Sequence, residues 1–152
     1  MSPGTMSKRV ILERVGWTRK MLDKLGTLPL ASLELFTADD RNIAAAESYL
    51  RRALESLFDL GRHILAKGFG QGVTEYKEIA TQLALLGLLE NPEADGMREM
   101  AGYRNRLTHF YHEVSARELY DISANRASDI ERVLDALLVW LRNHPDRLNG
   151  SL

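Results

Sequence analysis

A short segment in the second half of the chain gathers side chains that can perform chemistry. It reads Arg104-Asn105-Arg106-Leu107-Thr108-His109-Phe110-Tyr111. An arginine holds phosphate oxygens through its planar guanidinium and keeps its charge at every physiological pH. A histidine accepts or donates a proton near neutral pH, because its ordinary pKa is about 6.5. These residue types are therefore suited to phosphate binding and proton transfer.

Helical periodicity predicts how this segment presents its side chains. At ~100° per residue, Leu107 and Phe110 share one face, and we expect that face to be buried. The polar members gather on the remaining surface: Arg104, Asn105, Thr108, His109, Tyr111 and His112. They are grouped where a helix in a monomer would meet water.

Two alternatives fit the same pattern. Polar side chains on the outer face of an amphipathic helix commonly do no more than contact water. His109, His112 and Glu113 also have the three- and four-residue spacing that can converge on a zinc ion, but the HExxH arrangement and a further ligand are missing. The chain has no cysteine, which excludes a thiolate metal site and a cysteine nucleophile. We therefore expect no metal and no cofactor.

The bulk composition is that of a single globular domain. The chain has 152 residues, 45% of them hydrophobic, which is enough for one core. Its net charge of -1 argues against a general nucleic-acid coat protein but is compatible with an enzyme that grips a short RNA segment. The longest apolar run, Leu83 to Leu89, is too short for a membrane span, and residues 1–10 are not a secretory signal. We expect a cytoplasmic protein without membrane contact.

Apolar residues recur at helical spacing along nearly all of the chain, and no sustained alternating run indicates a strand. Helices are expected at about 7–25, 37–67, 74–89, from about 93 into the 104–111 segment, and at 115–123 and 125–143. Thr37 is expected to cap the second helix, with Asp39 and Asp40 in its first turn. Four or five amphipathic helices predict an all-α, antiparallel up-and-down bundle. We expect one domain over residues 1–152, with residues 1–6 as a disordered leader.

The pattern Arg104-Asn105-x-Leu107-x-His109-x-Tyr111 resembles the Arg-x4-His-x-Tyr signature of HepT-like toxins. These toxins belong to the HEPN superfamily (higher eukaryotes and prokaryotes nucleotide-binding). The resemblance extends upstream to residues 53–64, 70–76 and 102–103, and it covers roughly Ile43 to Leu141. Thr108 departs from the pattern, because an aliphatic residue is common there.

The resemblance implies a metal-independent endoribonuclease that works as a dimer, with the two motifs lining one cleft. His109 would then perform acid–base chemistry, Arg104 would stabilise the phosphorane, and Asn105 would orient one of them. Arg104 and His109 are ~140° apart on an ideal helix, so they do not converge within one straight segment. Either the helix distorts near Thr108 or residues from two protomers combine. Two copies of Arg104 and Arg106 would make such a cleft locally positive.

The resemblance also implies a partner and a form of regulation. Such toxins are commonly paired with a minimal nucleotidyltransferase antitoxin, in a toxin–antitoxin system of type II or type VII character. The antitoxin adenylylates the motif tyrosine, which is Tyr111 in this sequence. The alternative is a non-catalytic HEPN module that binds a nucleotide or the nucleotidyltransferase without cleaving RNA.

Residues outside the motif are expected to have structural roles. Asp59 and His63, one turn apart, are predicted to form a local hydrogen-bonded pair. Trp17 and Trp140 are predicted to lie in the core or an interface rather than to stack on bases. The 7–25 helix is rich in cations, and a solvated face is favoured over a flank for RNA. The cations are Lys8, Arg9, Arg14, Arg19, Lys20 and Lys24, against Glu13 and Asp23.

Overall fold

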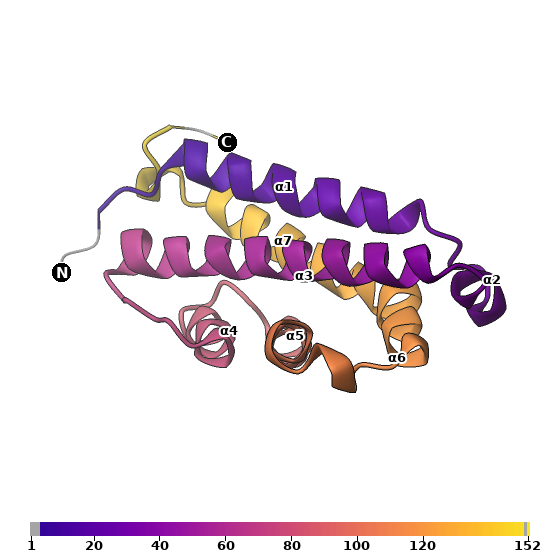
Figure 1. Cartoon of the computed structure of the whole chain (residues 1–152). Helices are drawn as coiled ribbons and strands as arrows, with labels where there is room; N and C mark the ends of the chain where they lie inside the picture. Colours follow the sequence, from indigo (N-terminus) through magenta and orange to yellow (C-terminus); the bar gives the residue numbers. More distant parts are fainter. Residues whose placement is uncertain (1–3, 151) are drawn as a thin grey trace.

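A computed structural model describes residues 4–150 and 152, without the side chain of Tyr111, and these residues form an all-α bundle (Figure 1). The helices are α1 (Lys8–Gly26), α2 (Leu33–Thr37), α3 (Asp40–His63), α4 (Tyr76–Leu85), α5 (Asn91–His109), α6 (Ala116–Asp121) and α7 (Ala127–Arg142). No strand occurs among the described residues, and the predicted all-α bundle is confirmed. Within that part of the chain, no helix is both long and apolar enough to span a membrane.

The long helix α3 is the centre of the molecule. It lies beside α1 along most of its length, while α4 and α5 pack against its other side and α7 completes the bundle (Figure 1). The α3 side chains Leu50, Leu54, Leu57 and Phe58 are fully buried, in one hydrophobic cluster with residues from the other helices. Two π-helical turns, Ile64–Gly68 and Ile122–Arg126, extend α3 and join α6 to α7.

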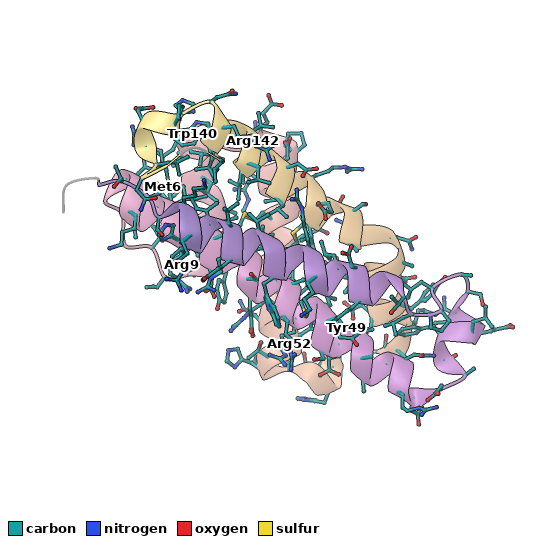
Figure 2. The ribbon with its side chains drawn as sticks, turned by 90° about the horizontal axis from the view of Figure 1, so that it is seen from above. Met6, Arg9, Tyr49, Arg52, Trp140 and Arg142 are labelled. Atoms are coloured by element: carbon teal, nitrogen blue, oxygen red, sulfur yellow. The ribbon has the colours of Figure 1, made fainter. Side chains whose placement is uncertain are left out.

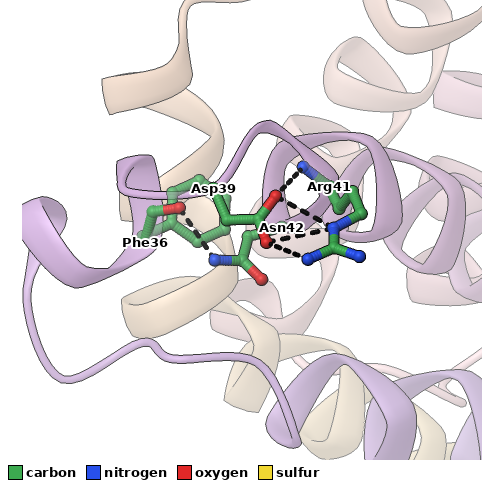
Figure 3. Close-up of polar contacts among 4 residues, drawn as sticks. All are labelled: Phe36, Asp39, Arg41 and Asn42. Atoms are coloured by element: carbon green, nitrogen blue, oxygen red, sulfur yellow. Dashed lines mark hydrogen bonds and ion pairs between the residues drawn. The ribbon is translucent and has the colours of Figure 1, made fainter.

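The first turn of α3 is stabilised by Asp39, not by Thr37 as the sequence suggested. The Asp39 carboxylate accepts a hydrogen bond from the Arg41 backbone N–H at 2.9 Å and also binds the Arg41 guanidinium (Figure 3). Asn42 donates a side-chain hydrogen bond to the Phe36 carbonyl at 3.1 Å, which fixes the turn between the two helices. Thr37 is the last residue of α2, a short helix that the periodicity left unclear.

The helix α5 is shorter at its C-terminal end than the motif pattern implied. Pro92 lies in its first turn, where a missing backbone N–H costs nothing. Leu107 is buried as expected, but the helix ends at His109, and Phe110 leaves it with φ -131 and ψ 37. The prediction that Phe110 lies in the core is therefore wrong, because its side chain is 50% exposed.

The start of the described chain is packed rather than loose. Met6 is fully buried, and its N–H donates to the Arg147 carbonyl at 2.8 Å while its own carbonyl accepts from Asn149 at 3.1 Å. A Cβ at Gly68 would lie 3.0 Å from the Met6 sulfur, so the Met6 side chain packs tightly against this glycine. The prediction of a disordered leader is therefore wrong for residues 4–6, and residues 1–3 lie outside the described residues.

Candidate functional site

Arg104 points from α5 towards α3 and α4 instead of towards solvent. Its Nη2 lies 3.6 Å from the Glu55 carboxylate on α3, and its guanidinium lies over the Tyr76 ring on α4, 4.4 Å from the ring centroid. The side chain is only 16% exposed. The expectation that it sits on a water-facing surface is therefore wrong, because a helical wheel does not show which neighbouring helices cover a polar face.

The two residues that hold Arg104 are themselves fixed by neighbours. The Tyr76 ring packs against Phe58 at a centroid separation of 5.0 Å. The helices α3 and α4 approach closely at Gly61, where a Cβ would lie 2.8 Å from a methyl carbon of Ile79. Glu55 also binds Arg51 at 3.4 Å, so its carboxylate lies between two guanidinium groups.

The buried part of Arg104 is incompletely satisfied. Its Nε is buried and has no hydrogen-bond partner among the residues that the structure describes. A buried, unpaired donor is costly unless a ligand or water reaches it. Arg104 thus combines a fixed position with spare capacity for an acceptor, which is what a phosphate-binding arginine requires.

His109 occupies a different environment at the end of the same helix. It is the last residue of α5, and its side chain is exposed next to the exposed Phe110 ring, with centroids 6.5 Å apart. His109 is therefore accessible to a macromolecule. Asn105, which follows Arg104 on the same helix, is half-buried.

Arg106 holds the turn that follows the motif. Its guanidinium binds both Glu118 carboxylate oxygens, one of them at 2.8 Å, and donates to the Glu113 carbonyl at 3.3 Å. The Glu118 hydrogen bonds raise the pKa of Arg106. Arg106 was expected to add positive charge to a cleft, but Glu118 balances that charge. It instead ties α6 and the Tyr111–Glu113 turn to α5.

Two predictions about the motif have different outcomes. Tyr111 begins the 3-10 turn after α5, but its side chain lies outside the described residues, so its predicted approach to Arg104 stays a prediction.

The zinc alternative finds no support. No group of three or more His, Cys, Asp or Glu side chains is placed to hold a metal ion in the part of the chain described, so His109, His112 and Glu113 are not brought together in this way.

Glu55 and Tyr76 were missed by sequence reasoning. Neither residue lies near the motif in the chain, and each joins it only through the packing of α3 and α4 against α5. Both lie in the upstream segments 53–64 and 70–76 that carry the family resemblance, but nothing in the sequence connects either of them with Arg104.

A helical bundle of this kind, with an Arg-x4-His segment at the end of one helix, has the fold of solved HEPN toxins. The chain belongs to the ribonuclease HepT-like family, whose model matches residues 20–137. No curated protein matches its sequence.

Solved structures share the fold at low sequence identity. A tri-AMPylated HEPN toxin from Shewanella oneidensis, in complex with its MNT antitoxin, is 19% identical, with a TM-score of 0.77 over 86% of this chain and 97% of that chain. A toxin–antitoxin structure with AMP-PNP is 19% identical, with a TM-score of 0.75 over 84% and 97% of the two chains. The cytosolic protein YutE from Bacillus subtilis is 17% identical, with a TM-score of 0.76 over 93% and 94%.

Proposed function

We propose that this protein is a metal-independent endoribonuclease and the toxin of a toxin–antitoxin pair of type II or type VII character. The observation that carries the proposal is that α5 holds one motif residue, Arg104, in a covered position and another, His109, in an exposed one. The chain belongs to the ribonuclease HepT-like family. Arg104 is held in place by Glu55 and Tyr76 and keeps a buried, unused donor, whereas His109 is open to a large substrate.

The proposed reaction is an attack of the RNA 2′-hydroxyl on the adjacent phosphorus. A base removes the 2′ proton, the O2′–P bond forms, the P–O5′ bond breaks, and an acid returns a proton to the 5′-oxygen. His109 is assigned to these proton transfers, Arg104 to the charge of the phosphorane, and Asn105 to their orientation. The products are a 2′,3′-cyclic phosphate and a 5′-hydroxyl.

The assembly that this chemistry needs is a two-fold homodimer. Arg104 is turned towards Glu55 on α3, whereas His109 lies at the exposed end of α5, so one protomer presents them in different directions. A second copy facing this end of α5 supplies the missing partner for each residue. Exposed Phe110 gives the dimer an apolar contact beside the motif.

Regulation is proposed to act through Tyr111. A minimal nucleotidyltransferase antitoxin would transfer AMP to its hydroxyl, and the added phosphodiester would occupy the phosphate site and repel RNA. The proposal is supported by the fold shared with a toxin described as tri-AMPylated and bound to its MNT antitoxin.

One observation favours a second candidate, the non-catalytic HEPN partner of a nucleotidyltransferase. Arg104 is already paired with Glu55 and mostly covered, as an arginine with a purely structural role would be. In that case the bundle would serve antitoxin binding without RNA cleavage.

Incubation of the purified protein with RNA in EDTA separates the two candidates. The enzyme leaves 2′,3′-cyclic phosphate ends that mass spectrometry detects, and His109→Ala abolishes them while Arg142→Ala, an exposed residue on α7, does not. Intact RNA with the wild-type protein, together with tight binding of the antitoxin, would establish the binding module instead. Light scattering of the same samples tests the dimer.

A further inference from the structure

Two adjoining hollows lie along the seam between α1 and α3. Their volumes are about 160 Å³ and 340 Å³, and Arg14 and Asp59 line both of them. We call their combined surface the α1–α3 groove, defined by Arg14, Trp17, Arg52, Asp59, His63 and Lys67. Figure 2 shows Arg52 on this flank of the molecule and Trp140 and Arg142 on the opposite flank, beside α7.

The groove is long and follows one face of α3. Arg52, Asp59 and His63 recur at intervals of seven and four residues, which places them on the same side of the helix. From Arg52 to Lys67 the helix rises about 22 Å at 1.5 Å per residue. A surface of this length suits an extended chain better than a compact small molecule.

The charge of the groove is positive on a protein whose net charge is -1. Four cationic side chains line the two hollows, because Arg62 joins Arg14, Arg52 and Lys67 there, against the carboxylates of Glu55 and Asp59. Asp59 is already bound by Arg62 at 3.1 Å and approached by Arg14 at 4.0 Å. It does not form the predicted pair with His63, whose Nε2 instead accepts the Ser7 N–H at 3.2 Å.

Arg52 and Lys67 are the cations of the groove that remain exposed. Burial and then the charges of Lys67 and Arg14 lower the pKa of the His63 imidazole, which lies in the same groove. An anion that entered the groove would therefore meet several cations and few free carboxylates.

Trp17 adds an aromatic surface to these charges. It lies on α1 at one wall of the groove and is 41% exposed, although the sequence suggested a core or interface position. The Lys20 ammonium lies 5.5 Å from the ring centroid. Proteins that bind single-stranded nucleic acid without reading its sequence combine a positive groove with aromatic rings on which bases stack.

We propose that the α1–α3 groove binds the sugar–phosphate backbone of single-stranded RNA, with a base stacked on Trp17. The inference rests on the ribonuclease function proposed above and extends the substrate contact beyond the motif. Glu55 joins the two surfaces, because it lines the groove and also binds Arg104. A strand that follows the groove therefore arrives beside the arginine of the motif.

The test measures binding separately from cleavage. The probe is a fluorescent 2′-O-methyl RNA of about eight nucleotides, within the ~4–16 nucleotides typical of such sites, which lacks the attacking hydroxyl. Arg52→Ala/Lys67→Ala should weaken binding and reduce the slope of log K against log salt by about 0.7 for each lost phosphate contact. The matched control, Arg132→Ala/Arg142→Ala on α7, removes the same charge and should bind as the wild type does.

Trp17→Ala should weaken binding about 5- to 150-fold, whereas Trp17→Phe should retain most of it. Circular dichroism checks that each variant is folded. The proposal would be overturned if the groove variant and the control variant bound the RNA equally well. It would also be overturned if the groove variant lost binding to the antitoxin while its RNA binding stayed unchanged. Intact binding with no cleavage of unmodified RNA by the wild type would instead contradict the ribonuclease function and leave the groove in place.

Discussion

The guanidinium of Arg104 on α5 lies 3.6 Å from the carboxylate of Glu55 on α3, so the arginine of the motif is also part of the contact between two helices. The Tyr76 ring covers it from α4. Substitutions at residue 104 will therefore change stability as well as activity, and the two effects have to be measured together.

Arg104→Ala should abolish RNA cleavage and also destabilise the fold by roughly 1–3 kcal/mol, because it uncovers the Tyr76 ring and leaves Glu55 with one partner fewer. Urea unfolding gives the free energy. Arg104→Lys keeps the charge but loses the planar contact with Tyr76, so we expect an intermediate stability and a large loss of activity. An Arg104→Ala variant with wild-type stability would contradict the observed packing.

His109→Ala should reduce cleavage about 10²- to 10⁴-fold with a change in unfolding free energy of at most ~0.5 kcal/mol. The reason is its exposed position at the end of α5, where truncation leaves no cavity. Initial rates on a labelled RNA, measured beside thermal unfolding, check both parts. Wild-type rates in a folded His109→Ala protein would remove this residue from the reaction.

Coexpression with the cognate nucleotidyltransferase should raise the mass of the protein by one or more AMP units, and Tyr111→Phe should prevent this. Intact-mass spectrometry of both forms is the measurement. Modification that persists in Tyr111→Phe would move the acceptor elsewhere. Of the nearest alternatives, Tyr120 already donates its hydroxyl to the Leu30 carbonyl at 3.1 Å, and burial raises the pKa of Tyr103.

His63 should make stability depend on pH. Burial and the charges of Lys67 and Arg14 lower its folded-state pKa below the ordinary 6.5. The unfolded chain therefore takes up a proton first as the pH falls. The stabilisation is complete above about pH 6.5 and is lost as the pH drops from there through the lowered pKa of the folded state.

The measurement is the Tm as a function of pH across this interval. His63→Gln should remove this part of the pH dependence while an amide oxygen still accepts the Ser7 N–H. His109→Gln, a change at an exposed histidine, serves as the control and should keep it. An unchanged pH profile in His63→Gln would assign the dependence to other groups.

Periodicity alone was enough to predict most of the helices. In α1 and α7, apolar residues at helical spacing form the buried faces of the helices. Leu107 lies in the core, as its position on the helix indicated. These features depend on residues three and four apart, which a single sequence displays directly.

Features that depend on which helices meet could not be obtained in the same way. The pattern placed Arg104 with the solvent-facing residues, although Glu55 and Tyr76 cover it. It placed Phe110 in the core because nothing in the sequence marks the end of α5 at His109. It also treated Met6 as part of a loose leader, since the residues that bind its backbone, Arg147 and Asn149, lie far from it in the sequence.

The backbone contacts of Met6 determine when this corner of the fold can form during synthesis. Its backbone is bound by Arg147 and Asn149, which are synthesised long after it. Until those two residues have been made, the Met6 backbone lacks these hydrogen bonds, however well α1 and α3 have already paired. The contact forms only once both residues have been made, so a variant truncated before Arg147 would leave the Met6 backbone without these partners.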